Sequence, residues 1–356
     1  MMKQIDYLKA ISIISVIILH TLPVNILNIT LCQFHIWNAV PIFIILSSFT
    51  TYISCDKKKL NLKELYNLEY IIKKIKRIIY PIIYVFIITL LIGIIFNKEI
   101  YIGFRNLIAY MPVTGPGNYY ITLLLQYIII SPLCYYLYKK MPKMSLIISL
   151  IINVISEVLL YYVQDNYLYS SCLLRYTFLI FLGFYLFEII TYKNKRLDKK
   201  SKSFLIIGLI VSISYMIIIN FYSIPFFNER WKRQLFLADF YPLMIVYLGF
   251  KFLPNKLDKI INIGKWSYHI FLVQMVYFII NPIEIIFNKY LEINKIIQYP
   301  ILIIFNCIIC IFVGYLFYLC TNQIERYFKN KFNRKKEEKN EYISSNTSKR
   351  WLKRNT

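Results

Sequence analysis

Long apolar runs alternate with short polar segments along most of the chain. A helix needs about 20 apolar residues to cross the roughly 30 Å hydrocarbon layer of a membrane. Ten runs approach that length, at residues 7–27, 36–53, 78–96, 119–138, 144–163, 171–192, 203–221, 235–253, 266–287 and 299–320. Many of their ends carry Tyr or Trp, as helices do at a membrane interface. The pattern predicts an all-α, polytopic integral membrane protein with ten transmembrane helices.

The ten helices form one predicted transmembrane domain, residues 1–320. The remaining segment, 321–356, is polar and basic. We expect this segment to be a cytoplasmic tail, a short helix followed by disorder, that rests against anionic lipid.

Composition narrows the class of protein further. Of the 356 residues, 58% are hydrophobic and only 17% are charged, against about 25% charged in an ordinary soluble domain. The chain has 9 Gly, 12 Pro and 7 Cys, which excludes a collagen and a small disulfide-stapled secreted domain. Heavy use of Ile, Lys, Tyr and Asn indicates an AT-rich bacterial genome. The expected location is therefore the plasma membrane of a bacterium.

Positive charge is distributed unevenly between alternate loops. Lys and Arg total 42 and Asp and Glu total 18, a net charge of +24. With the N-terminus inside, 33 of the Lys and Arg residues fall in cytoplasmic segments and 7 in outer segments. Cytoplasmic loops of membrane proteins carry such an excess. The distribution predicts that both termini are cytoplasmic, and it accounts for the charge without nucleic acid as a partner.

The loop count leaves over two basic residues, Lys9 and Arg175, which lie inside predicted spans. Ionisable side chains are costly in a bilayer and usually face a cavity or a partner. Lys9 and His20 are eleven residues apart, which places them about 20° apart around a helix and roughly 16 Å apart along it. Imidazole can act as a general base, and Lys as a fixed cation. Equally, Lys9 could reach the headgroups and His20 could bond a neighbouring helix.

Acidic residues also lie inside the predicted spans, at Glu157, Glu188, Asp239 and Glu284. Glu157 and Arg175 flank a short outer turn, residues 164–170. Because antiparallel helices joined by that turn hold the two residues at similar depth, we predict a buried ion pair between them. The pair could be structural or could contact a substrate. Asp239 lies near the outer end of the eighth span.

Five stretches of the chain together resemble acyltransferase family 3, a family of membrane proteins. The first is Lys9, ten residues and then His20 in the first helix. The others are Val40–Phe43 with Ser47–Phe49, Lys73–Arg77 before Tyr80 and Pro81, Gly117–Tyr120 through Gln126 and Pro132, and Gly264–Gln274. The resemblance covers residues 1–320. The chain departs from the family pattern at Lys9, where Arg is commoner, at Ser48, where Gly is usual, and at Gln274, where the family has His.

The resemblance implies transfer of an acyl group, usually acetyl, from a cytoplasmic acyl-CoA to a hydroxyl of a carbohydrate or lipid-linked glycan at the outer face. It implies that His20 is the catalytic residue and Lys9 its partner, and that Lys74 and Arg77 meet the anionic CoA. Acyl-CoA is then a substrate, and neither a tightly bound cofactor nor a metal site is expected. The candidate substrate-binding residues are Arg175, Glu157, Asp239, Tyr119 and Tyr120.

Two other functions stay open from the sequence. A polysaccharide or small-molecule exporter without acyl-transfer chemistry would also cross the membrane many times. Transporters often show paired repeats with broken helices at matching positions, and we see no such symmetry here. A sensor or binding protein that kept the family fold and lost activity would fit the departures at Lys9, Ser48 and Gln274. A second catalytic histidine is conceivable at His35, although contact with headgroups suits its place at the outer rim better.

Overall fold

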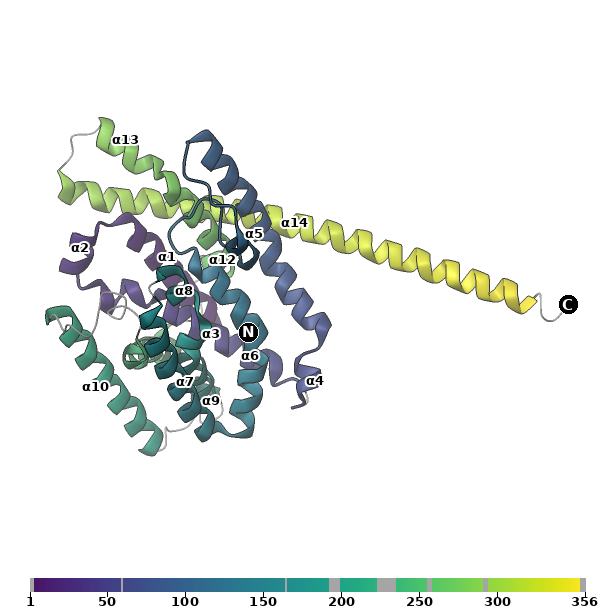
Figure 1. Cartoon of the computed structure of the whole chain (residues 1–356), viewed down its shortest axis with the longest axis horizontal. Coiled ribbons are helices and arrows are strands. Elements are labelled where there is room, and N and C mark those ends of the chain that lie inside the picture. The colour runs from purple at the N-terminus through teal and green to yellow at the C-terminus, as the bar shows by residue number, and fades with distance from the viewer. Residues whose placement is uncertain are drawn as a thin grey trace.

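The structure is a computed structural model, and it describes residues 3–58, 60–163, 165–191, 199–222, 235–254, 258–290 and 294–352. Every regular element in these ranges is a helix, as the apolar pattern predicts (Figure 1). The α-helices are α1 (Lys3–Thr21), α2 (Val24–Ile29), α3 (Ala39–Cys55), α4 (Leu62–Leu65), α5 (Leu68–Ile95), α6 (Tyr119–Lys140), α7 (Pro142–Tyr162), α8 (Asn166–Ser171), α9 (Thr177–Thr191), α10 (Lys199–Phe221), α11 (Phe240–Phe252), α12 (Asp258–Ile280), α13 (Pro282–Tyr290) and α14 (Lys295–Leu352). Short 3₁₀ helices join them: η1 (Cys32–Phe34), η2 (Ile36–Asn38), η3 (Phe104–Ile108), η4 (Leu173–Tyr176) and η5 (Phe236–Ala238).

Within the described ranges, nine helices are long and apolar enough to cross a membrane. They correspond to nine of the ten predicted spans, and together they indicate a multi-pass membrane protein. The exception is the predicted span 235–253. There α11 begins only at Phe240, after η5 and Asp239. Its 13 residues rise about 20 Å, which is less than the roughly 30 Å of hydrocarbon.

The last helix extends further than the sequence predicts. We expect only a short helix after residue 320, whereas α14 continues through Leu352 and projects well past the other helices (Figure 1). Residues 315–352 contain neither Gly nor Pro, the residues least favourable inside a helix. The sequence therefore offers no strong stop signal in this stretch.

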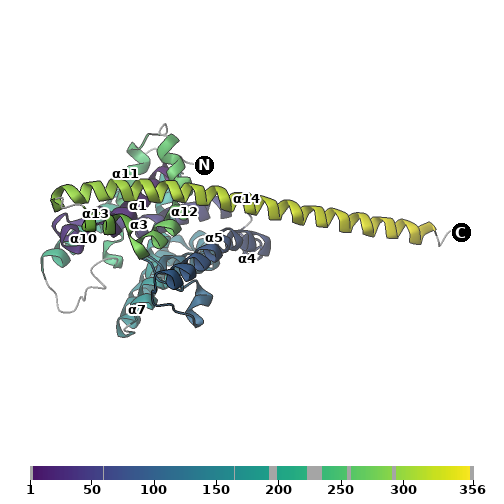
Figure 2. The ribbon, with the colours of Figure 1, turned by 90° about the horizontal axis from the view of Figure 1, so that it is seen from above.

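Helix α1 lies at the centre of the packing. It contacts α3, α12 and α14, and α12 packs in turn against α5 and α14. Figure 2 shows α14 lying along the body beside α1 and α12. The backbones of α1 and α12 approach so closely at Gly264 that a Cβ there would lie 1.7 Å from the carbonyl oxygen of Asp6. This contact fixes the Lys9 end of α1 against α12.

We expect Gly264→Ala to destabilise the protein, because a backbone carbonyl cannot move aside unless a whole helix shifts. The cost should be on the order of 1–3 kcal/mol, seen as a lower thermal midpoint of the purified protein in detergent. Gly103→Ala is the matched control, since its Cβ would meet only the flexible side chain of Tyr101. Equal midpoints for the two variants would contradict the close contact between α1 and α12.

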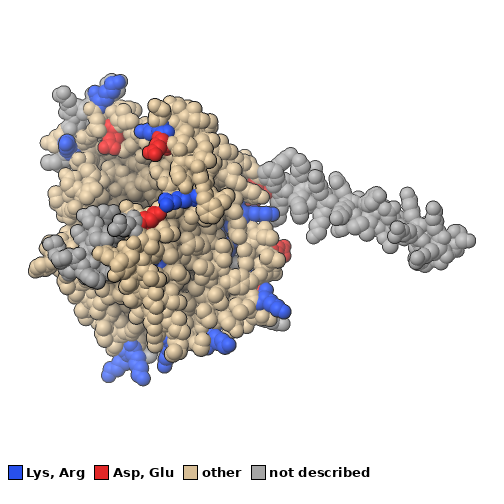
Figure 3. Space-filling model, in the orientation of Figure 1, with Lys and Arg blue, Asp and Glu red and all other residues tan. Residues whose placement is uncertain are grey.

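The outward faces of several helices are apolar. Exposed aliphatic side chains lie along α5, α7, α10 and α14, for example Ile94, Leu159, Ile207 and Ile308. The face shown in Figure 3 is mostly uncharged, and its Lys and Arg side chains lie mainly around the margins. Soluble monomers rarely expose apolar surface of this extent. These faces suit lipid as the surrounding medium.

Candidate active site

One uninterrupted helix, α1, carries both Lys9 and His20. The structure therefore has the continuous helix on which the predicted relation between Lys9 and His20 depends. Both side chains are half-buried. The imidazole thus lies in the last turn of α1, and the cation lies eleven residues before it on the same helix.

His20 lies where α1, α12 and α14 meet. Its ring faces Phe278 of α12, with 6.0 Å between the ring centroids. Next to it, Asn306 of α14 donates a hydrogen bond to Thr21 Oγ1 over 3.1 Å, and the Tyr277 hydroxyl donates to Asn306 Oδ1 over 2.6 Å. The His20 imidazole itself has no hydrogen-bond partner among the described residues. It is therefore available to a substrate hydroxyl.

Lys9 lies in a charged region in the N-terminal half of α1. Its Nζ is 3.9 Å from Oδ1 of Asp6, which is buried. Arg77 of α5 is close enough to act electrostatically on Lys9. The Tyr268 hydroxyl donates to the backbone carbonyl of Ile78 over 3.0 Å and so ties α12 to α5 beside Arg77. The structure thus places two predicted site residues, Lys9 and Arg77, near each other.

Lys74 lies one turn before Arg77 on α5 and is half-buried. Its charge acts on Cys55 at the end of α3. Lys74 and Arg77 therefore extend the basic region from Lys9 toward α3. Sequence reasoning missed Asp6 as the partner of Lys9, although a spacing of three residues in a helix was an available signal.

The predicted ion pair between Arg175 and Glu157 is confirmed. Arg175 Nε lies 3.0 Å from Glu157 Oε1, and both side chains are 2% exposed. The Tyr169 hydroxyl donates to Glu157 Oε2 over 2.8 Å, and Arg175 donates to both the hydroxyl and the backbone carbonyl of Tyr169. Burial raises the pKa of the Tyr169 phenol, so it keeps the proton that it donates. Tyr169 is a member of the site that the sequence did not reveal.

Asp239 lies beside this ion pair. It is buried close to both partners, and its Oδ2 has no hydrogen-bond partner among the described residues. An unpaired carboxyl oxygen can accept a hydrogen bond from a hydroxyl. We call Glu157, Tyr169, Arg175 and Asp239 the Arg175 cluster. It unites three of the candidate substrate-binding residues.

Tyr119 and Tyr120 begin α6 and face different surroundings. Tyr120 is buried and packs edge-to-face on Phe271 of α12, with 5.2 Å between the ring centroids. Tyr119 is half-buried and lies close to Tyr176, the chain neighbour of Arg175. Tyr120 therefore belongs to the packing between α6 and α12, whereas Tyr119 lies on the side of the Arg175 cluster.

A second ionic cluster, which the sequence did not indicate, joins α3, α6 and α9. Lys139 Nζ lies 3.2 Å from Asp56 Oδ1 and 3.7 Å from Glu188 Oε1. Tyr52 and Tyr138 each donate a hydrogen bond to Glu188 over 2.8 Å. The cluster holds together three helix ends that the predicted topology places on the cytoplasmic side. The sequence predicts Glu188 inside a span, and its carboxylate is compensated there by Lys139, Tyr52 and Tyr138.

Two unusual positions of the sequence, Ser48 and Gln274, are buried at helix contacts. A Cβ on Gly183 of α9 would lie 2.8 Å from Ser48 Cβ, so α3 and α9 pack closely there. Gln274 Nε2 donates to the Pro116 carbonyl over 3.4 Å, and its Oε1 has no partner in the described part of the chain. Both side chains therefore contribute to packing in this structure.

Comparison with known proteins assigns the chain to a family. Residues 2–319 match the model of one family, described as an acyltransferase domain. No curated protein and no solved structure matches the chain. Within the described residues, no group of three or more His, Cys, Asp and Glu side chains could hold a metal ion. The matched range includes both ends of α1, the basic end of α5 and the Arg175 cluster.

Proposed function

The chain belongs to acyltransferase family 3, and from that premise we propose that it transfers an acyl group, usually acetyl, from acyl-CoA to a hydroxyl of a cell-surface or lipid-linked carbohydrate. The arrangement of α1 supports the proposal. His20 lies in the last turn of this continuous helix, and Lys9 lies eleven residues before it, near Arg77. In this proposal the chain crosses the plasma membrane of a bacterium and keeps both termini in the cytoplasm.

The chemistry needs a base for the acceptor hydroxyl. His20 takes the hydroxyl proton as the oxygen attacks the thioester carbonyl, the carbon–sulfur bond breaks, and the proton passes to the leaving thiolate of CoA. A relay in which His20 first receives the acyl group would use the same imidazole as a nucleophile. Lys9 and Arg77 are the fixed positive charges that attract the anionic donor.

Isolated membranes that contain the wild-type chain test this proposal. We expect label from radioactive acetyl-CoA to appear in a glycan fraction as an alkali-labile ester. Membranes from cells that lack the chain are the control. If no chain-dependent label appeared with acetyl-CoA or with longer acyl-CoA donors, the proposed reaction would be wrong.

The basic end of α5 predicts how the donor binds. We expect Lys74→Gln and Arg77→Gln each to raise the KM for acyl-CoA about tenfold or more, because a charge-assisted hydrogen bond to a phosphate contributes roughly 1.5–3 kcal/mol. The KM for the acceptor should change little. Lys63→Gln, at an exposed residue of α4, is the matched control. An equal rise in KM for Lys63→Gln would show general charge attraction in place of a defined donor site.

A further inference from the structure

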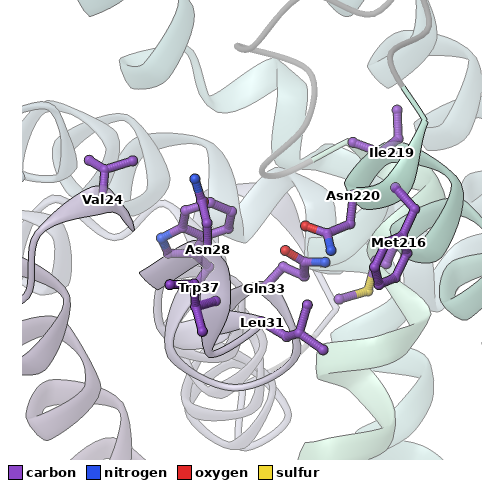
Figure 4. A pocket seen from close by; sticks show the side chains of 10 residues that line it. Val24, Asn28, Leu31, Gln33, Trp37, Met216, Ile219 and Asn220 are labelled. Carbon is purple, nitrogen blue, oxygen red and sulfur yellow. The ribbon is translucent and has the colours of Figure 1, made fainter. Parts of the chain in front are cut away.

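A cavity of about 440 Å³ lies between the segment that follows α1 and the end of α10. Its walls include Asn28 of α2, Gln33 of η1 and Trp37 of η2 on one side, with Met216, Ile219 and Asn220 of α10 on the other. Figure 4 shows the carboxamides of Gln33 and Asn220 pointing toward one another across it. Cavities of this size hold small-molecule ligands in other proteins. We call it the Gln33 pocket.

Three carboxamides line the Gln33 pocket, from Asn28, Gln33 and Asn220. Each carboxamide offers two donors and one acceptor oxygen without charge, which matches the paired hydroxyls of a sugar ring. Gln33 Nε2 is buried and has no hydrogen-bond partner among the described residues. Trp37 adds a large aromatic surface suited to the C–H face of a sugar.

The chain turns sharply to build this wall. Leu31 has φ 51° and ψ 47°, a left-handed conformation that a residue with a Cβ adopts only at an energetic cost. Two side chains hold the turn: Asn38 Nδ2 donates to the Gln33 carbonyl over 2.7 Å, and His35 Nε2 lies 2.8 Å from the Thr30 carbonyl. Backbone strain of this kind gathers at functional sites. The position of Gln33 is thus fixed by its own turn.

The walls of the Gln33 pocket connect the two parts of the candidate site. Trp37 packs in one apolar cluster with Ile18 and Leu19, the residues that precede His20. Met216 and Ile219 pack in another cluster with Tyr169 of the Arg175 cluster. The pocket therefore lies between the His20 end of α1 and the Arg175 cluster.

We propose that the Gln33 pocket binds the carbohydrate that accepts the acyl group, with Gln33 and Asn220 bonding its hydroxyls and Trp37 packing on its ring. The role as acceptor site rests on the proposed function. The pocket's affinity for a sugar does not depend on the proposed function, and it can be measured without any acyl transfer.

Saturation-transfer NMR on the full chain in lipid nanodiscs tests the proposal. The probes are the methyl glycosides of glucose, galactose and N-acetylglucosamine, and nanodiscs avoid detergents with sugar headgroups. We expect at least one probe to bind the wild type, and Gln33→Met or Trp37→Leu to weaken that binding about tenfold or more. Trp37→Phe should retain most of it because an aromatic face remains. Asn25→Ala, at an exposed amide of α2 that does not line the pocket, is the matched control.

The outcomes test the pocket proposal separately from the proposed acyl transfer. Equal binding by the wild type, Gln33→Met and Trp37→Leu, or no binding of any probe to the wild type, would overturn the pocket proposal even if acyl transfer occurs. Loss of binding in the pocket variants but not in Asn25→Ala would support the pocket even in a chain that transfers no acyl group. Thermal midpoints equal to that of the wild type confirm that each variant is folded.

Discussion

His20→Ala is expected to lower acyl transfer by about 100- to 10,000-fold, the range that a positioned general base contributes. The imidazole lies against Phe278 and has no hydrogen-bond partner in the described part of the chain, so its removal breaks no observed polar contact. The loss should therefore appear in catalysis and not in folding. The measurement is acetyl-CoA-dependent labelling of envelope glycans in cells that express each variant.

A residue outside the sites described above supplies the control for this experiment. Asn25 of α2 is exposed and does not line the Gln33 pocket, so Asn25→Ala should retain most of the activity. Protein abundance in the membrane and the thermal midpoint show whether each variant is inserted and folded. Full activity in a normally inserted His20→Ala chain would remove His20 from the mechanism.

Arg175→Leu is expected to lower the free energy of unfolding by about 3–5 kcal/mol, the cost of breaking a buried ion pair on one side. Glu157 would remain buried without the guanidinium that compensates its charge. The double variant Glu157→Leu/Arg175→Leu should be more stable than Arg175→Leu, since it removes the stranded carboxylate. Thermal or denaturant unfolding in detergent measures both variants.

The same pair of variants separates the two roles left open for this ion pair. A double variant that folds and transfers acyl groups normally would mean that the pair is structural. One that folds and still transfers acyl groups, but with a raised KM for the acceptor and an unchanged KM for the donor, would mean that the pair contacts the acceptor. An Arg175→Leu chain as stable as the wild type would contradict the buried pair itself.

Structural features that depend on one segment of the chain, or on two segments joined by a short turn, were predictable from the sequence. The long apolar runs correspond to nine membrane-length helices in the described ranges, because hydropathy and helix length are local properties. The contact between Arg175 and Glu157 was predictable because one short turn joins their helices. The short α11 was not, since apolar side chains continue on both sides of Asp239 while the helix begins only after it.

Features that depend on distant helices were not predictable. Lys139, Asp56 and Glu188 lie on three different helices, and nothing in their separate runs shows that the ends of these helices converge. The Gln33 pocket likewise unites residues 24–37 with residues 216–221. Hydropathy indicates which residues lie within a membrane span, but it does not indicate which helices are neighbours. Sites formed between helices can therefore be identified only from the structure.

The backbone contact at Gly264 bears on how anything could pass through this protein. Transport by alternating access generally requires one group of helices to rock against another around a central site. Where α1 and α12 meet at Asp6 and Gly264, no layer of side chains separates them to act as a sliding surface. We expect α1 and α12 to move as one rigid pair of helices. In the proposed function, the donor approaches the Lys9 end of α1 and the acceptor approaches its His20 end. Under the proposed function, only the acyl group has to pass from one end of this helix pair to the other.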